Sequence, residues 1–256
     1  ARTAFQVERA GRRSAWEPWR DGPIEPGIER TLYKRVDGTG VTFEEVHRGL
    51  GLRFRTSLAT CDAFGLVRSA VLDELDGTPV TVGYLDGWHD LLPAGVGEDL
   101  WSRYSYLAAA YMRHERVPGL PLAIHALNAT ISDRPEPAES LRVAAAWSIG
   151  HRDPAILLCD RQAREFLHGR PVRGEDEIRG EVGAFLAVDA VTLGARGTHR
   201  WTTVADTGLD ASAVIGLRTL LADPAAAAVR LAEAVEASRE GIRRRVAGAE
   251  IGRAHV

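Results

Sequence analysis

One short segment of the sequence gathers several side chains that could do chemistry. It reads Asp86-Gly87-Trp88-His89-Asp90, so that two carboxylates, an imidazole and an indole ring lie close together. An aromatic ring can lie against the C–H face of a pyranose, and carboxylates accept hydrogen bonds from its hydroxyl groups. We therefore predict a carbohydrate-binding site at Asp86, Trp88 and His89. The alternative is structural and is the one we favour for Trp88, because Asp-Gly forms turns and Trp88 can anchor a core beneath the next helix.

Two adjacent glutamates, Glu44 and Glu45, are a second candidate site. Glycosidases use two carboxyl groups at a separation set by the mechanism, so either glutamate, with Asp86 or Asp90 as the second acid, could form a self-contained glycoside hydrolase. Adjacent residues on a strand face opposite sides. The structural alternative therefore has one glutamate in solvent and the other capping a turn or paired with Arg48 or Arg53.

Other matches to known motifs are incomplete. Residues 151–153 (HRD) are similar to a kinase catalytic loop and residues 62–65 (DAFG) to a metal-binding loop, but their order is reversed and no glycine-rich loop precedes them. The pair His114-Glu115 lacks the second histidine of a zinc helix. Neither Cys61 nor Cys159 has the spacing of a zinc site. We therefore assign no catalytic residue, no metal site and no cofactor.

Composition and charge narrow the class of protein. Of the 256 residues, 45% are hydrophobic and 26% are charged, which is typical of a folded globular chain. The net charge of -3 gives no basic surplus for nucleic acid. No apolar stretch approaches the roughly 20 residues that span a bilayer. With two cysteines and no secretory segment, we expect a cytoplasmic protein without nucleic-acid or membrane partners.

Short alternating runs predict a β-rich fold. Strands are expected at 30–36, 41–46, 50–59, 66–75, 79–85, 122–129, 140–148, 183–193 and 200–205. Asp37-Gly38 and Asp76-Gly77 are typical of tight hairpin turns, because Asp-Gly readily adopts positive φ. We expect the first five of these strands to form an antiparallel meander.

Helices are expected at fewer places. Apolar spacings of three and four predict an amphipathic helix over 97–117, and 161–168 and 211–221 read as shorter helices. A closing helix is expected over 224–246, with Asp223 as its N-cap. The predicted fold is mainly β (α+β), a large antiparallel β-sandwich with inserted helices and a C-terminal linker helix. We divide the chain into an irregular segment (1–27), the sandwich (28–222) and the helical linker (223–250).

Several short segments resemble one family. The chain is similar to the amino-terminal part of large bacterial proteins related to cellobiose phosphorylases, the glycoside hydrolase family 94 type. The segments are 43–45 (FEE), 50–54 (LGLRF), 65–68 (GLVR), 85–93 (LDGWHDLLP), 136–141 (EPAESL) and 146–148 (AWS). Trp88 and His89 depart from the family pattern, in which leucine and an amide are more usual.

The resemblance implies a noncatalytic sandwich that shapes the substrate site or a subunit interface. In such enzymes a helical linker and an (α/α)6 catalytic barrel follow, the substrate is an oligosaccharide, and inorganic phosphate is the co-substrate of a phosphorylase. A homodimer is a further expectation. The alternatives are an assembly module that binds no carbohydrate and the hydrolase built on Glu44, Glu45 and Asp86.

The sequence begins at Ala1, and its one methionine is Met112. Its last six residues, 251–256 (IGRAHV), match a translation of ATC GGA AGA GCA CAC GTC, which resembles a short-read sequencing adapter. We therefore expect this tail to be adapter-derived, with the natural reading frame continuing beyond about Ala249.

Overall fold

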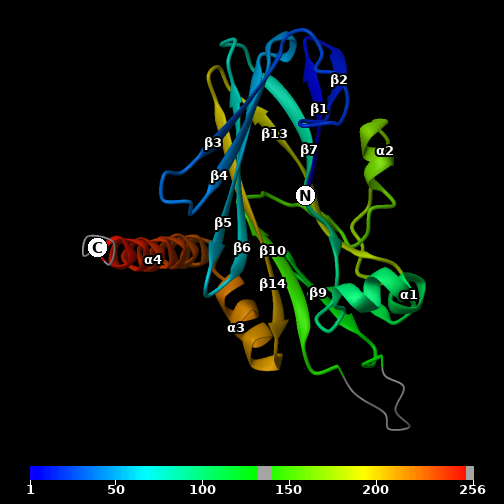
Figure 1. The fold of residues 1–256 in the computed structure, drawn as a ribbon. Helices are drawn as coiled ribbons and strands as arrows, with labels where there is room; N and C mark the ends of the chain where they lie inside the picture. The colour runs from blue at the N-terminus through cyan, green and yellow to red at the C-terminus, as the bar shows by residue number, and fades with distance from the viewer. Residues whose placement is uncertain (132–139, 252–256) are drawn as a thin grey trace.

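The computed structural model describes residues 1–131 and 140–251, and within these ranges the fold is mainly β, as predicted (Figure 1). A five-stranded antiparallel sheet has the order β11-β13-β7-β1-β2, and a nine-stranded antiparallel sheet has the order β12-β8-β9-β10-β14-β6-β5-β4-β3. The strands are β1 (Arg2–Arg9), β2 (Arg12–Trp16), β3 (Ile28–Lys34), β4 (Val41–His47), β5 (Leu52–Cys61), β6 (Gly65–Glu74), β7 (Val80–Leu91), β8 (Met112–Arg116), β9 (Leu122–Leu127), β10 (Val143–Ile149), β11 (Ala155–Leu157), β12 (Glu177–Arg179), β13 (Gly183–Leu193) and β14 (Thr198–Leu209). The α-helices are α1 (Glu98–Ala110), α2 (Ala163–Leu167), α3 (Ala211–Leu221) and α4 (Pro224–Ile251).

The two sheets pack face to face, and strand β7 shows how alternation builds their shared core. Val82 and Tyr84 point inward and pack with Phe54 of β5 and Trp201 of β14. Leu85 points outward, where it packs with residues of α2. Because successive side chains of a strand face opposite sides, β7 contributes side chains both to the core between the sheets and to the contact with α2.

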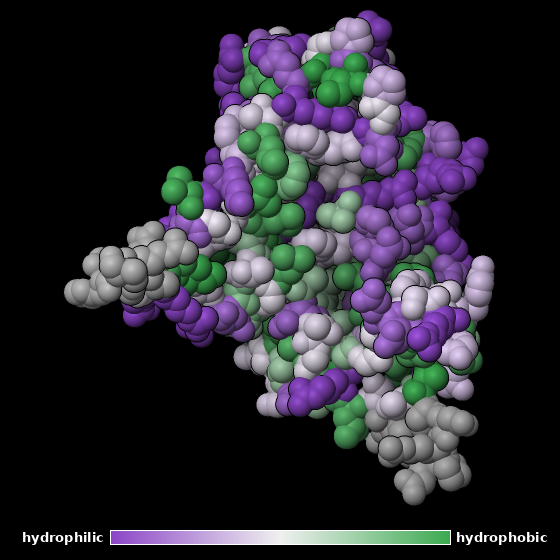
Figure 2. Space-filling model, in the orientation of Figure 1, coloured by the Kyte–Doolittle hydropathy of each residue, from purple (hydrophilic) through white to green (hydrophobic). Residues whose placement is uncertain are grey.

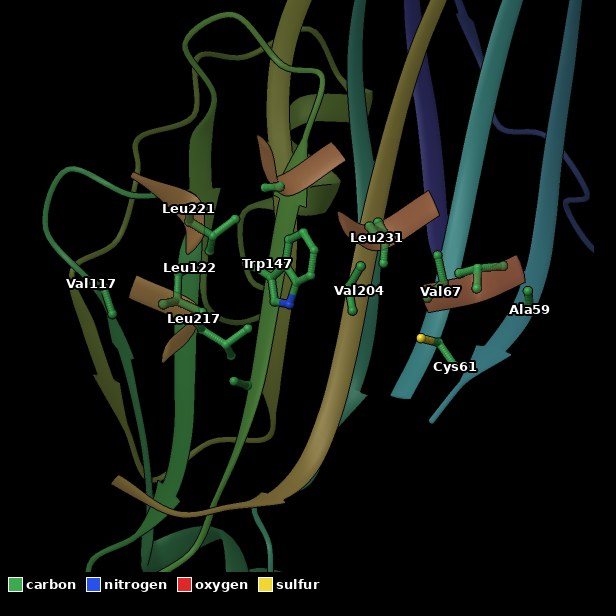
Figure 3. Close-up of a cluster of buried hydrophobic side chains, with 13 residues drawn as sticks. Ala59, Cys61, Val67, Val117, Leu122, Trp147, Val204, Leu217, Leu221 and Leu231 are labelled. Atoms are coloured by element: carbon green, nitrogen blue, oxygen red, sulfur yellow. The ribbon is translucent and has the colours of Figure 1, made fainter. Parts of the chain in front are cut away.

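Helices α3 and α4 cover the outer face of the nine-stranded sheet. Trp147 of β10 lies at the centre of this contact, with Leu217 and Leu221 of α3 and Leu231 of α4 around it (Figure 3). The predicted cap of α4 is confirmed, because the Asp223 carboxylate accepts hydrogen bonds from two backbone N–H groups of the first turn. The far end of α4 extends away from the sandwich (Figure 1).

The predicted meander is confirmed for four strands and is wrong for the fifth. Strands β3 to β6 are neighbours in chain order, but β7 belongs to the other sheet, so Asp76-Gly77 is a crossover between sheets and not a hairpin turn. Glu74 holds this crossover: its carboxylate accepts hydrogen bonds from the backbone N–H groups of Asp76, Gly77 and Arg196 and from the Arg9 guanidinium. Burial would raise the pKa of Glu74, but these hydrogen bonds lower it to about 2.

Two further expectations need correction. The amino-terminal segment 1–27 is not wholly irregular, because β1 and β2 form a hairpin and β1 pairs with β7 inside the five-stranded sheet. The sandwich therefore begins at Arg2. The helix expected over 97–117 ends at Ala110, and β8 follows it at once. Met112 is fully buried in this strand and still packs against α1.

The outer surface is mixed in character. Hydrophilic residues dominate the periphery of the face in view, whereas hydrophobic residues gather in its middle, above α4 (Figure 2). No single helix in the described residues is long and apolar enough to cross a membrane. Helices α3 and α4 meet that test of length and composition only together, as a pair bent by 119°.

Candidate functional site

Asp86 lies at the centre of a polar cluster that is enclosed between the two sheets. Its carboxylate forms an ion pair with the Arg68 guanidinium and accepts hydrogen bonds from Thr3 Oγ1 at 2.6 Å and Trp201 Nε1 at 2.7 Å. Arg68 also donates to Thr3 Oγ1 at 2.7 Å. The Asp86 side chain has no exposed surface. These contacts make it a structural carboxylate that joins β1, β6, β7 and β14.

The three residues expected to bind carbohydrate do not share an open surface. Asp86 is enclosed and has no exposed surface, so sugar contact at Asp86 stays a prediction without an accessible carboxylate in this structure. Trp88 is 7% exposed and packs between the sheets with Phe185 and Ile156, not beneath α1 as expected. His89 keeps a partly exposed side chain, whose Nδ1 lies 2.7 Å from a carboxylate oxygen of Asp90. Carbohydrate contact at His89 remains a prediction.

Glu45 is held in the same way as Asp86, in a separate cluster. Trp16 Nε1 donates to one carboxylate oxygen at 2.7 Å, and the other accepts from the Trp19 backbone N–H at 2.9 Å and from Arg30 Nε at 2.7 Å. The carboxylate is fully buried. It holds strands β2, β3 and β4 together.

Glu44 faces the other side of β4 and is largely covered. It accepts a hydrogen bond from the Tyr33 hydroxyl at 3.2 Å, and Nε of Arg53 and of Arg55 lies 3.9 Å away. A glycosidase needs one carboxyl group that reaches the glycosidic oxygen and a second that reaches the sugar or a water. Glu45 and Asp86 are both enclosed, whereas the Asp90 side chain is exposed. The hydrolase alternative stays a prediction.

A second polar cluster reaches the surface, and sequence reasoning missed it. The Tyr84 hydroxyl lies 2.9 Å from His151 Nδ1, 3.0 Å from His199 Nε2 and 3.5 Å from a carboxylate oxygen of Asp189. The Tyr84 ring stacks on Trp201 with centroids 4.7 Å apart. This cluster therefore joins β7, β13, β14 and the loop after β10.

Burial sets the protonation of this cluster. It lowers the pKa of His151 to about 4 and also lowers that of His199, so both imidazoles are neutral at pH 7. Burial raises the pKa of Tyr84, and the nearby Asp189 carboxylate adds to that effect. Asp189 also accepts a hydrogen bond from the backbone N–H of Arg152 at 2.8 Å.

The sequence holds only a weak signal for this cluster. His151 belongs to the incomplete kinase-like match at 151–153, and His199 lies just before the predicted strand 200–205. Only the pairing of strands brings these histidines to Tyr84. Tyr84, His151, Asp189 and His199 are far apart in the sequence, so a search for short motifs does not find the cluster.

A buried pair of histidines is formed by His114 of β8 and His125 of β9. His114 Nδ1 and His125 Nδ1 are 2.9 Å apart, and His114 Nε2 lies 2.8 Å from the backbone carbonyl oxygen of Glu181. Within residues 1–131 and 140–251, no group of three or more His, Cys, Asp or Glu side chains is placed to hold a metal ion. Cys61 and Cys159 are both buried free thiols.

Comparisons with known proteins give structural similarities only. No family model matches the sequence. No curated protein matches it either. A bacterial glucoamylase complexed with acarbose aligns with 85% of this chain and 28% of its own, at 12% identity and a TM-score of 0.46. A polysaccharide lyase aligns with 80% of this chain and 25% of its own, at 12% identity and a TM-score of 0.42.

A heparinase III aligns with 72% of this chain and 22% of its own, at 9% identity and a TM-score of 0.35. The chain thus spans about a quarter of the length of these three solved structures.

Proposed function

We propose that this chain is the noncatalytic sandwich region of a larger carbohydrate-active enzyme of the glycoside phosphorylase or hydrolase kind. In this proposal the whole enzyme acts on an oligosaccharide, with inorganic phosphate as co-substrate in a phosphorylase. The sandwich shapes the substrate site or a subunit interface. The catalytic residues lie in a barrel domain of the full-length protein.

The observation that carries the noncatalytic part is the enclosure of Asp86 and Glu45. Each carboxylate already accepts hydrogen bonds at both of its oxygens from buried or partly buried donors. Neither can therefore protonate a leaving group or attack a sugar. Asp86 and Glu45, the carboxylates that were candidates for glycoside hydrolysis, instead hold neighbouring strands together.

The order of elements supports the link to a phosphorylase-like enzyme. The resemblance implies a sandwich followed by a helical linker, and α3 and α4 follow β14 in that order. The segments of resemblance at 43–45, 50–54, 65–68 and 85–93 lie on strands β4 to β7 and their connections. Residues 136–139 of the resembling segment 136–141 lie outside the described residues, as do residues 252–256 of the tail.

Two experiments test this proposal. The complete gene is expected to encode an (α/α)6 barrel with a catalytic aspartate or glutamate after Ala249, and a different architecture there would remove the phosphorylase assignment. The purified chain is expected to show no phosphorolysis or hydrolysis of β-glucosides. Activity that disappears in Glu45→Gln while the fold is retained would instead support the hydrolase alternative.

One observation favours the alternative of an assembly module. Helix α1 exposes three apolar side chains: Tyr106 is 94% exposed, Tyr104 57% and Leu107 47%. Exposed aromatic residues of this kind are enriched at protein interfaces. Sedimentation analysis is expected to show self-association that Tyr106→Asp abolishes, whereas a monomer at all concentrations would rule this alternative out for the isolated chain.

A further inference from the structure

Helix α4 is held against the sandwich in two different ways along its length. In its first half, Ala227, Leu231 and Val235 are buried and pack with residues of β5, β6 and β10. Within the described range 236–248, no residue of the helix is buried. Hydrophobic burial therefore fixes only the first half of α4.

Polar contacts take over in the second half. Ser238 Oγ accepts a hydrogen bond from the backbone N–H of Asp62 at 3.0 Å, in the turn between β5 and β6. Further along the helix, Arg243 Nε donates to a carboxylate oxygen of Asp37 at 3.0 Å, in the turn between β3 and β4. These two contacts tie α4 to the tips of two successive hairpins.

Both partners of the second contact are oriented by neighbours on their own element. The Asp37 carboxylate accepts from Thr39 Oγ1 at 2.6 Å, from the Thr39 backbone N–H at 3.1 Å and from Arg35 Nε at 3.3 Å. These hydrogen bonds, above all those from Thr39, lower the pKa of Asp37, so the carboxylate is charged at neutral pH. On α4, the Arg243 guanidinium also donates to Glu236 at 3.0 Å. Little ordering is therefore left for Asp37 and Arg243 to undergo when they meet.

Gly241 lies between the two contacts, after Ser238 and before Arg243. Glycine weakens a helix interior, because its backbone is the least restricted. A Cβ at Gly241 would meet no atom within 4 Å, and the φ of this residue lies outside the region that favours glycine. Neither packing nor backbone conformation therefore requires glycine here, and its presence places a flexible point just before Arg243.

We propose that Gly241 is a hinge in α4 and that Asp37 and Arg243 form a clasp that keeps the hinge straight. When the clasp is closed, the end of α4 is held near the turn between β3 and β4; when it opens, the residues beyond Gly241 swing away. The Asp37 side chain is 20% exposed and that of Arg243 37%, so salt weakens the clasp. The inference does not rest on the proposed function, because it concerns only contacts within this chain.

The test is a distance measured by pulsed electron paramagnetic resonance between spin labels on Val36→Cys and Val246→Cys. Both positions are exposed, whereas the two natural cysteines are buried and should stay unlabelled. Val36 adjoins Asp37, and Val246 lies about 7.5 Å beyond Gly241 along the helix, so a bend at Gly241 separates the labels. We expect one narrow distance distribution for the doubly labelled chain at low salt. Arg243→Ala should lengthen the mean distance by several ångströms and broaden the distribution.

Two further variants sharpen the test. Arg244→Ala removes the same side chain one residue along the helix, where it contacts Glu240 and not the hairpin, and should leave the distribution unchanged. Adding Gly241→Ala to Arg243→Ala should restore the narrow distribution, because alanine stiffens the helix without the clasp. In about 1 M salt, where charges are screened beyond about 3 Å, the otherwise unchanged labelled chain should approach the behaviour of Arg243→Ala.

Circular dichroism establishes that each variant keeps its helix content. A distribution that Arg243→Ala leaves unchanged would overturn the clasp, as would equal effects of Arg243→Ala and Arg244→Ala. A broad distribution that persists after Gly241→Ala is added to Arg243→Ala would overturn the hinge.

Discussion

Arg68 of β6 and Asp86 of β7 form a fully buried ion pair that joins the two sheets of the sandwich. Removing one partner of such a pair leaves an uncompensated charge in the interior. We expect Asp86→Asn to lower the free energy of unfolding by about 3–5 kcal/mol, measured by urea denaturation. Asp90→Asn makes the same chemical change on the same strand at an exposed side chain and should cost much less. Equal losses in the two variants would contradict a structural role for Asp86.

Gly87 occupies a position on β7 that admits no side chain. Its φ is +157°, and a Cβ there would lie 1.9 Å from the backbone carbonyl oxygen of Phe185 on β13. We expect Gly87→Ala to destabilise the chain by about 1–3 kcal/mol. Gly83→Ala on the same strand is the control, since its Cβ would meet Gln6 at an ordinary 3.7 Å. A thermal melt that ranks Gly83→Ala as the more damaging change would refute this assignment.

Trp88 is expected to stabilise the core between the sheets. It is 7% exposed among side chains of both sheets, so Trp88→Ala should lower the free energy of unfolding by about 3–5 kcal/mol. Tyr106→Ala removes an exposed aromatic ring and serves as the control. An unchanged melt for Trp88→Ala, with weaker sugar binding in the full enzyme, would show instead that the ring contacts substrate.

Stability is expected to fall as the pH decreases below about 6.5, the ordinary pKa of histidine. Burial lowers the pKa of His125 to about 3, with a further contribution from His114, and burial lowers that of His151 to about 4. The unfolded chain therefore binds more protons than the folded chain in this range, and the proton uptake favours unfolding.

The loss is at most about 1.4 kcal/mol per pH unit for each histidine. Urea denaturation between pH 7.5 and 5 measures this slope, and His125→Gln should reduce it. A slope that is flat in the wild type, or identical in His125→Gln, would contradict the burial of a neutral imidazole.

Local sequence patterns predicted many of the strands and helices. Alternation located β3 to β6 and gave the bounds of β13 as the structure has them, because side-chain period depends only on neighbouring residues. The bounds of α3, expected from its helix-forming composition, also agree. The expected helix over 97–117 ran too far because Tyr111 and Met112 continue the helical spacing, although the chain turns into β8 there. The sequence analysis placed β1 in an irregular segment because the prolines and glycines between Glu17 and Gly27 suggested that regular structure begins only after them.

The candidate site depended on information that no short segment contains. Asp86 was expected to face solvent because its neighbours suit a sugar site, yet the partner that encloses it, Trp201, is distant in sequence. His151 and His199 likewise meet at Tyr84 only after β7, β10 and β14 are placed. Strand order decides these contacts, and strand order is not a local property.

The position of β7 between β1 and β13 has a consequence for how the chain is made. During synthesis β7 can pair with β1 as soon as it leaves the ribosome, but its other edge stays open until Gly183 to Leu193 have been added. An open strand edge is a template for association with other chains, and pairing across such distances is slow. Between these two pairings the nascent chain is exposed to aggregation through the open edge of β7. A fragment that stops before β13 is therefore expected to aggregate more readily than the complete sandwich.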